Sequence, residues 1–474
     1  MVDRTLGPLL ILDQIAEGRM HLAAVFVAPP GQPVPPIRIA GIDVPVQPLI
    51  AYGPAQLWRA RFTLPADAPS AYEWDGTRFD IASNLSGDLR LAYASCNGEE
   101  HGDLDRDEDE RNAMWAHLAV QHRAAPFALL LHGGDQVYAD EATKGHPLSE
   151  DWPEKLPRDP LPHDLDDLRT HLREGFAERY ITQLQHADYA WLVARAPSLA
   201  QWDDHDICDG WGSLPRSRTY SAVGKVLFEV AKEAALAFQH GTVSGDLPPR
   251  FADPEGYHLN WAVEAPGLRL LGPDLRSERT RRQVMDDGGW ADVEAHAKAE
   301  FEGRTLVMSS VPLLGPRLSV LEALMVLTPK MQKYEDDLRD QWQSRAHRDS
   351  WRRMLRAMMQ MQEQEGQDVT ILSGEIHLAT RATMAARNGQ MLHQLVASGI
   401  THRPPPRAWA RTLGALSRLG EAPLPGHRIR IRRIPGQALR YVAERNALVL
   451  ERRGDTWEAV WHFEHSGPSP AFPI

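Results

Sequence analysis

The stretch Phe-Ala-Leu-Leu-Leu-His-Gly-Gly-Asp-Gln-Val-Tyr, residues 127–138, decides the fold of this chain. Five apolar residues open it, as in a buried strand, and a polar loop follows at once. Gly133 and Gly134 allow the backbone to approach a ligand closely. Asp135 and Tyr138 lie three residues apart, so both could reach one ion if the loop turns like the start of a helix. On its own, Gly-Asp is also a common turn sequence.

The same pattern of a short apolar run that ends in a polar cluster recurs along the chain. Further runs lie at Leu89–Ala94, Leu199–Trp202, Leu268–Leu271, Arg304–Met308 and Val369–Leu372. Helical patterns lie between them, including residues 222–239 and a charged stretch from residue 334 to about residue 365. Alternating strands, polar loops and helices predict an α/β fold. In such folds the loops at the carboxyl ends of the strands converge on one rim, where ligands bind.

The first 87 residues have a different texture. Short β-prone pieces such as Met20–Val27 and Leu57–Leu64 alternate with turns rich in Pro and Gly. We therefore predict a small β-sandwich-like domain over residues 1–87 and a catalytic domain over residues 88–474.

Three more polar clusters carry residues suited to metal chemistry. Asp203, Asp204 and Asp206 flank His205 after an apolar run, and such crowded carboxylates repel one another unless cations neutralise them. Glu375 and His377 sit two positions apart, so in an extended chain both would face the same side. The third cluster contains Cys96, which as a thiolate would be a soft metal ligand. Each cluster also has a structural interpretation: an exposed acidic turn, a core histidine or a small buried hydrophobe.

Composition limits the remaining possibilities. The net charge is −12, which argues against a general nucleic-acid binder, and Cys96 and Cys208 are too few for a disulfide framework. We see no export signal, and the apolar runs are too short to cross a bilayer, so we expect a cytoplasmic protein without a membrane partner. The acidic residues within 99–110 are interpreted as the opening of a helix. The Arg-rich segment 403–433 is interpreted as a solvated loop and strand face that could also attract an anionic substrate.

Taken in order, the motifs around Cys96, Asp135, Asp204, Arg276 and Glu375 closely resemble the PhoD-type alkaline phosphatase family. That family is similar to the purple acid phosphatases and other calcineurin-like metallophosphoesterases. The match runs from Leu89 to about Ala379. The resemblance implies a calcineurin-like four-layer α/β/β/α sandwich.

The resemblance also implies a dinuclear metal centre. Cys96, Asp135, Tyr138 and His377 would hold Fe³⁺, and Asp135 would bridge to a divalent ion such as Ca²⁺ or Mn²⁺. Asp204 and Glu375 would bind that second ion, and His205 would face the phosphate. The family commonly has Asp where this chain has Glu375, which puts the identity of the divalent ion in question. With His377 neutral, the other five ligands carry five negative charges when deprotonated. These would balance the five positive charges of a trivalent and a divalent ion.

From this site we expect hydrolysis of phosphate mono- or diesters by a metal-bound hydroxide. His205 would stabilise or protonate the leaving group, and Arg276 would bind phosphate oxygens unless it only forms a salt bridge. Nucleic acid enters only as a possible substrate. Cys208 is expected to be a packing residue. The alternative is a catalytically silent scaffold or binding protein that has kept the fold.

Overall fold

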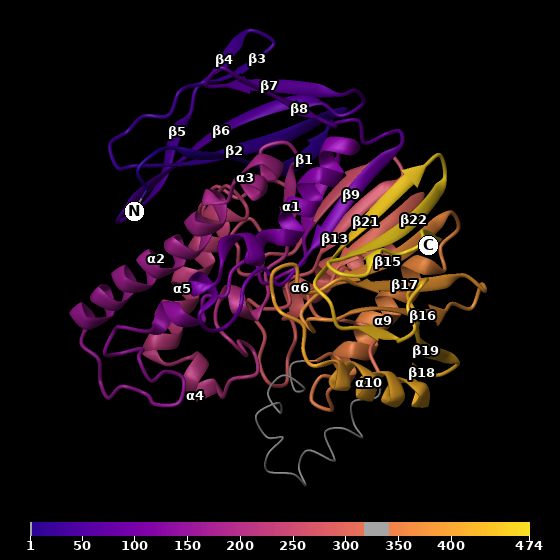
Figure 1. Cartoon of the computed structure of the whole chain (residues 1–474). Helices are drawn as coiled ribbons and strands as arrows, with labels where there is room; N and C mark the ends of the chain where they lie inside the picture. The colour runs from indigo at the N-terminus through magenta and orange to yellow at the C-terminus, as the bar shows by residue number, and fades with distance from the viewer. Residues whose placement is uncertain (1, 317–340) are drawn as a thin grey trace.

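The computed structural model describes residues 2–316 and 341–474, and within them the strands form three sheets (Figure 1). The first sheet has eleven strands, in the order β23 (Gly467–Pro468), β22 (Thr456–Phe463), β21 (Asn446–Arg453), β9 (Leu89–Ala94), β10 (Leu129–His132), β11 (Ser198–Ala200), β1 (Leu6–Ala16), β2 (Arg19–Ala28), β6 (Ala55–Pro65) and β5 (Gln47–Tyr52), with β24 (Phe472–Pro473) paired to β22. The second has nine strands, in the order β12 (Trp261–Ala265), β13 (Leu268–Gly272), β14 (Gly303–Met308), β15 (Gln367–Ser373), β17 (Met391–Val396), β16 (Ala379–Ala385), β19 (His427–Arg432) and β18 (Glu421–Leu424), with β20 (Tyr441–Val442) paired to β16. The third has four strands, in the order β4 (Ile42–Val44), β3 (Ile37–Ile39), β7 (Ser70–Trp74) and β8 (Thr77–Ile81).

All six strands expected from the apolar runs are present, as β9, β10, β11, β13, β14 and β15. In the first sheet β9, β10 and β11 are parallel, and their last residues Ala94, His132 and Ala200 lie in register. In the second sheet β13, β14, β15 and β17 are parallel, and Met308 pairs with Leu372 while Ser373 pairs with Val396. The polar cluster after each strand therefore begins at a common edge of its sheet.

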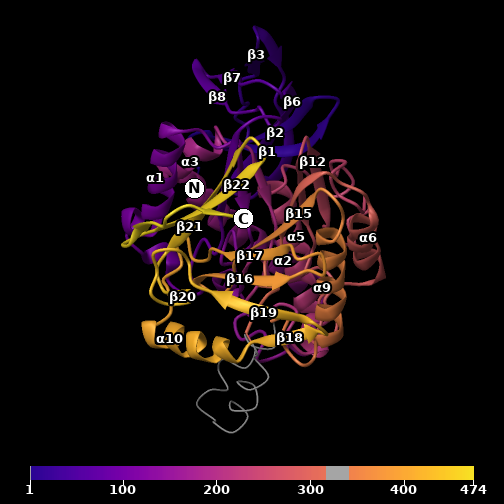
Figure 2. The ribbon, with the colours of Figure 1, turned by 90° about the vertical axis from the view of Figure 1, so that its right-hand side faces the viewer.

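The helices lie on the two sheets. Within the described residues they are α1 (Glu108–Ala124), α2 (Pro162–Gln185), α3 (Ala187–Val193), α4 (Arg216–Thr219), α5 (Ala222–Phe238), α6 (Asp287–Lys298), α9 (Arg348–Gln362) and α10 (Arg407–Leu416). Helices α1, α2 and α3 contact strands of the first sheet, whereas α9 contacts β15 and β17 of the second sheet and packs on α6 (Figure 2). This confirms the expected α/β class.

Two hydrophobic cores follow from the alternation of side chains along the second sheet. Leu306 and Met308 of β14 belong to the larger core, which they share with Leu130 and Trp461 of the first sheet. Val307, between them, belongs to a separate core with residues of α6 and α9. Because successive residues of a strand point to opposite faces, one strand buries side chains in both cores.

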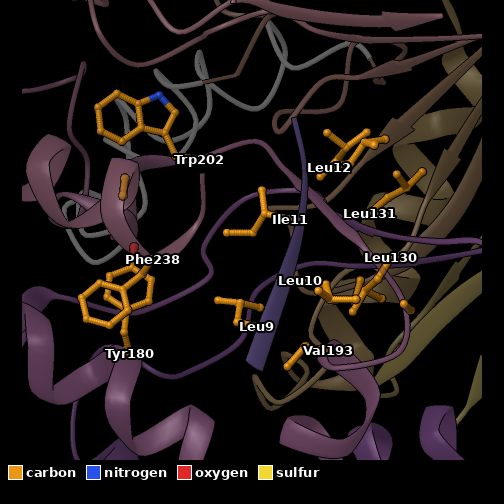
Figure 3. Packing of buried hydrophobic residues seen from close by; sticks show 14 of the residues in the cluster. Leu9, Leu10, Ile11, Leu12, Leu130, Leu131, Tyr180, Val193, Trp202 and Phe238 are labelled. Carbon is orange, nitrogen blue, oxygen red and sulfur yellow. The ribbon is translucent and has the colours of Figure 1, made fainter. Parts of the chain in front are cut away.

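Figure 3 shows the part of the larger core around the first strand of the chain. Leu10, Ile11 and Leu12 of β1 are fully buried, and Ile11 pairs with Ser198 of β11 in the parallel direction. Burying one such side chain is worth about 1.5–3 kcal/mol. The strand therefore anchors the N-terminal segment to the sheet that carries the polar loops.

The N-terminal segment contributes to two sheets. Strands β1, β2, β5 and β6 extend the eleven-stranded sheet, whereas β3, β4, β7 and β8 make the separate four-stranded one. Tyr72 of β7 stacks on Phe79 of β8, with ring centroids 4.8 Å apart. The first sheet thus crosses residue 87, where we place the domain boundary, and the division itself stays a prediction.

The expected helices are present with shifted ends. Helix α5 matches the pattern at 222–239, and its N-cap Ser221 accepts a hydrogen bond from the backbone N–H of Gly224. Helix α9 covers part of the charged stretch, whose residues 334–340 lie outside the described residues. Helix α1 starts with acidic residues behind the N-cap Asp107, as expected for residues 99–110. Among the helices of the described residues, we find none with the length and apolarity needed to cross a membrane.

Candidate metal centre

The loops that follow the strands of both sheets are joined by backbone hydrogen bonds. The N–H of Cys96 donates to the carbonyl of Gly134 (3.1 Å), and the N–H of Gly374 donates to the carbonyl of Ser310 (3.0 Å). The N–H of His402 donates to the carbonyl of Cys96 (3.3 Å), which links the two sheets. The polar ends of strands from both sheets therefore meet in one place.

Four of the six predicted metal ligands have a strained backbone. Cys96, Asp135, Glu375 and His377 have φ angles of 57°, 52°, 64° and 51°. Side-chain-bearing residues seldom adopt this left-handed region, and the cost is about 1–3 kcal/mol for each. Such outliers concentrate at functional sites, so their occurrence at these four positions supports a functional role for the loops.

The surroundings of Gly134 explain why the loop after β10 has a glycine at this position. Its φ is 109°, and a Cβ atom added there would lie 2.8 Å from the Cβ atom of Asp203. Real side chains do not approach so closely. The glycine therefore brings the loop containing Asp135 against the loop containing Asp203.

Cys96, Asp135 and His377 form one group that could hold a metal ion. Tyr138 belongs with it, because its hydroxyl lies 2.9 Å from Nε2 of His377 and 3.4 Å from Oδ2 of Asp135. The Sγ atom of Cys96 lies 3.1 Å from Oγ of Ser398. The structure thus brings together all four residues predicted to hold the trivalent ion.

The electrostatics of this group fit a cation. Burial and the nearby carboxylate of Asp203 raise the pKa of Asp135, whose buried Oδ1 atom has no hydrogen-bond partner among the described residues. Burial also raises the pKa values of Cys96 and Tyr138, and neighbouring anions add to both shifts. Burial lowers the pKa of His377, which favours the neutral imidazole that binds metals. A buried carboxylate oxygen with no donor, surrounded by other potential anions, suits a metal ion.

A second group consists of Asp135, Asp203 and Asp204. Asp135 belongs to both groups, as expected of a bridging ligand. Asp203 was not among the predicted ligands, although it stands in the same acidic cluster as Asp204. Both acids contact Arg276, which donates from Nε to Asp203 and from a terminal nitrogen to Asp204 at 3.2 Å.

Arg276 is fully buried, and its remaining terminal nitrogen donates to the carbonyl of Trp211 (2.9 Å). These contacts match a salt bridge, with Asp203 and Asp204 as partners in place of the neighbouring Asp274. Asp274 instead accepts hydrogen bonds from Trp202 (2.9 Å) and from the backbone of Arg276 (2.9 Å). The phosphate-binding role of Arg276 stays a prediction.

The carboxylate of Glu375 contacts a side chain that is not a predicted metal ligand. Both of its carboxylate oxygens accept hydrogen bonds from the side-chain amide of Gln341, at 2.6 and 2.7 Å. Among the described residues it belongs to none of the groups that could hold a metal ion. The role of Glu375 as a ligand of the second ion stays a prediction.

His205 contacts Asp140, an acid that lies far from it in the sequence. Its Nδ1 atom lies 2.9 Å from Oδ2 of Asp140, and its ring stacks on Tyr138 with centroids 4.2 Å apart. Burial opposes the charged form, yet Asp140 and Asp204 raise the pKa of His205 well above its usual value. The ring thus lies beside the predicted iron ligand Tyr138, and these two acids favour its protonated form.

Asp206 accepts hydrogen bonds from backbone N–H groups of the site. Its Oδ1 atom accepts the N–H groups of Gln136 (2.9 Å) and Val137 (3.2 Å), and its Oδ2 atom accepts the N–H of Asp203 (2.9 Å). Burial raises the pKa of this carboxyl group to about 7, against the effect of those hydrogen bonds. Asp206 therefore joins the loop of Asp135 to the loop of Asp203.

Two further residues near the centre escaped the sequence analysis. Glu100, His377 and His402 form another group of possible ligands, and the rings of His377 and His402 stack at 3.4 Å. His402 closes a polar cluster after the apolar strand β17, so the strand-end pattern could have found it. Glu100 lies in the acidic stretch that we assigned to the start of a helix, and no local signal sets it apart.

Cys208 is buried, and its N–H donates to the carbonyl of Asp204 (2.7 Å). Among the described residues it is in none of the possible metal groups. This agrees with a packing residue.

Comparison with known proteins places these residues in a family. The profile of PhoD-related phosphatases matches residues 78–335, more than half of the chain. The uncharacterized Saccharomyces cerevisiae protein YGR266W is 23% identical over 444 aligned residues, which cover 73% of this chain. The alignment covers 62% of the yeast protein, so the chain spans less than two thirds of that relative's length.

Solved structures show the same likeness in fold. The structure of PhoD superposes with a TM-score of 0.56 at 10% identity and covers 99% of this chain and 91% of PhoD. A dimetal phosphatase from Danio rerio gives a TM-score of 0.35 at 9% identity, over 81% of this chain and 98% of that one. The second likeness is too weak to support an argument.

Proposed function

Because the chain belongs to the PhoD-related phosphatase family, we propose that it is a metal-dependent phosphoesterase that hydrolyses phosphate mono- or diesters. The observation that carries this proposal is the meeting of Cys96, Asp135, Tyr138 and His377 beside Asp204. These donors come from four loops in two sheets, and a silent scaffold would have no need to retain them together.

We propose that the site holds a trivalent iron and a divalent ion. Cys96, Tyr138 and His377 would hold the iron, Asp135 would bridge the two ions, and Asp204 and Glu375 would hold the divalent one. Asp203 adds one negative charge to the five of the predicted anionic ligands, and the positive charge of buried Arg276 balances it. When bound, the ions would supply the positive charge that activates a water molecule and neutralises phosphate oxygens.

The protein residues would then position the substrate and the proton. Asp140 would accept the Nδ1 proton of His205, so in the protonated ring the Nε2–H would be available to the leaving-group oxygen. Stacking on Tyr138 fixes the plane of the ring. Arg276 keeps Asp203 and Asp204 close to Asp135, which is the role its contacts favour.

Metal analysis together with hydrolysis tests this function. Protein purified without chelators should contain iron and a divalent metal and should release phosphate from aryl and alkyl phosphates or cleave a diester. Chelator treatment should abolish the reaction, and the two metals should restore it. Stoichiometric metal without hydrolysis of mono- or diesters would favour the scaffold alternative.

A further inference from the structure

The carboxylate of Glu100 lies between two imidazole rings. Its two oxygens are 3.3 and 3.2 Å from Nε2 of His402, and Oε1 lies 4.0 Å from Nε2 of His205. The two histidines come from different sheets, since His205 follows β11 and His402 follows β17. Two ring nitrogens from separate parts of the fold therefore point at one anionic group.

An acceptor at Nδ1 holds each of the two imidazole rings in place. The Nδ1 atom of His205 faces Asp140 at 2.9 Å, and the Nδ1 atom of His402 faces the carbonyl of Arg403 at 2.7 Å. Each ring therefore faces an acceptor at both nitrogens, and holding the Glu100 carboxylate requires Nε2 as well as Nδ1 to carry a proton. Stacking completes the restraint, because His205 packs on Tyr138 and His402 packs on His377. The two Nε2 atoms thus form a preorganised pair, which lowers the cost of binding an anion.

Glu100 is the part of this arrangement that can leave. Its side chain is 38% exposed, whereas those of His205 and His402 are 10% and 12% exposed. The backbone around it is held: Glu99 accepts the N–H of Arg403 (3.2 Å), and the N–H of Gly102 donates to Glu141 (3.0 Å). A change of side-chain rotamer would therefore move the carboxylate to solvent without opening the loop.

We infer that His205 and His402 form a subsite for the phosphoryl group of the substrate, and that Glu100 occupies this subsite until phosphate displaces it. The inference rests on the proposed function and adds to it a second phosphate-binding imidazole and an internal competitor. A phosphoryl group carries at least the negative charge of a carboxylate and offers more acceptor oxygens. It can therefore take over both Nε2 contacts and reach the metal ligand loops at the same time.

The test measures binding of inorganic phosphate to the metal-loaded protein by calorimetry. Glu100→Gln removes the competing charge but keeps the size of the side chain. Its Kd for phosphate should fall about tenfold, the scale of one charge-assisted hydrogen bond, and KM for a phosphate ester should fall with it. An unchanged or higher Kd would overturn the inference.

Glu99→Gln is the matched control. It makes the same charge change one residue away, but within the described part of the chain Glu99 forms ion pairs with Arg106 (3.3 Å) and Arg403 (3.4 Å) and with no histidine. Its phosphate affinity should equal that of the unmodified protein, with folding checked by circular dichroism. An equal gain in both variants would mean a general charge effect and would contradict a specific competitor.

His402→Asn tests the other half of the subsite. Phosphate affinity should fall about tenfold while both metals remain bound, as measured by elemental analysis. Loss of metal from this variant would make His402 a metal ligand and would overturn the subsite. Phosphate titration tests the inference even if the protein hydrolyses no ester. If the protein hydrolyses esters but Glu100→Gln does not change its affinity for phosphate, the inference fails and the proposed function stands.

Discussion

The Nδ1 atom of His205 lies 2.9 Å from the Oδ2 atom of Asp140, sixty-five positions away in the chain. Asp140 also accepts the N–H of Asp209 at 2.6 Å, so the acid itself is held in place. This pair fixes the direction in which His205 can donate a proton. Loss of either residue should therefore affect proton transfer more than metal binding.

We predict that His205→Asn slows alkyl phosphates far more than nitrophenyl phosphate. Alkyl alkoxides are poor leaving groups that need a proton, and general-acid assistance is worth about 10²- to 10⁴-fold. Steady-state turnover on both substrates checks this, with both metals confirmed by elemental analysis. Asp140→Asn should show the same preference with smaller losses. Equal losses on the two substrates would contradict the proton-donating role and leave His205 with phosphate binding alone.

The two cysteines should behave in opposite ways. Cys96→Ala should lose iron and most activity, because Cys96 meets Asp135 and His377, whereas Cys208→Ala should keep both. Thiolate and phenolate ligands on ferric iron should give a visible charge-transfer band, which Cys96→Ala and Tyr138→Phe should abolish or shift. Absorption spectra and iron content measure this. A colourless, iron-free and fully active preparation would contradict the iron assignment.

The divalent ion should depend on Asp204 and Glu375 to different degrees. Each of Asp204→Asn and Glu375→Gln removes one negative charge, and we expect both to lose divalent metal with the fold retained. The loss should be larger for Asp204→Asn, because the carboxylate of Glu375 is bonded to Gln341. Metal titration gives the two affinities. If both variants keep full metal content and activity, the second ion is bound elsewhere.

Metal binding should become tighter as the pH rises. In the metal-free protein burial raises the pKa values of Asp135, Cys96 and Tyr138, and these groups must lose protons to bind a metal. Asp206 is not a predicted metal ligand, but burial raises its pKa as well, to about 7. A carboxyl group whose pKa is raised on folding stabilises the fold below its unfolded pKa and loses that effect as the pH rises through its folded pKa.

The chelated protein should therefore lose part of its stability between about pH 4 and pH 7, the range from the unfolded to the folded pKa of Asp206. The increase in melting temperature on adding metal should be larger at pH 8 than at pH 5.5. Differential scanning calorimetry at the two pH values measures it. An increase that is equal at both, or larger at pH 5.5, would contradict the assignment of protonated, buried ligands.

Asp206→Ala should destabilise the fold. The change leaves three buried backbone N–H groups without their acceptor, those of Gln136, Val137 and Asp203. We expect a loss of about 2–5 kcal/mol in the free energy of unfolding, measured in denaturant. Asp167→Ala, at an exposed position of α2, removes the same carboxylate and should cost less than about 0.5 kcal/mol. Similar losses in the two variants would show that the Asp206 bonds add little.

The strands of the α/β core, and the loops that hold the predicted metal ligands, can be read from the sequence alone. The apolar runs that end at Ala94 and Leu131 became β9 and β10, because a short apolar run between polar segments is a local property. Cys96, Asp135 and His377 were found for the same reason, since each follows the end of such a strand. Parallel pairing in register then brings the loops of each sheet to one edge of that sheet.

Only the tertiary structure decided which side chains face one another across those loops. Glu100 meets His402 across 302 positions of sequence, and Arg276 meets Asp203 across 73. Asp206 has the same residue type as Asp204 two positions away, yet it turns to backbone N–H groups while Asp204 turns to Arg276. Such choices depend on the packing of one sheet against the other and on the burial that follows, and neither is encoded in the spacing of residues along a single loop.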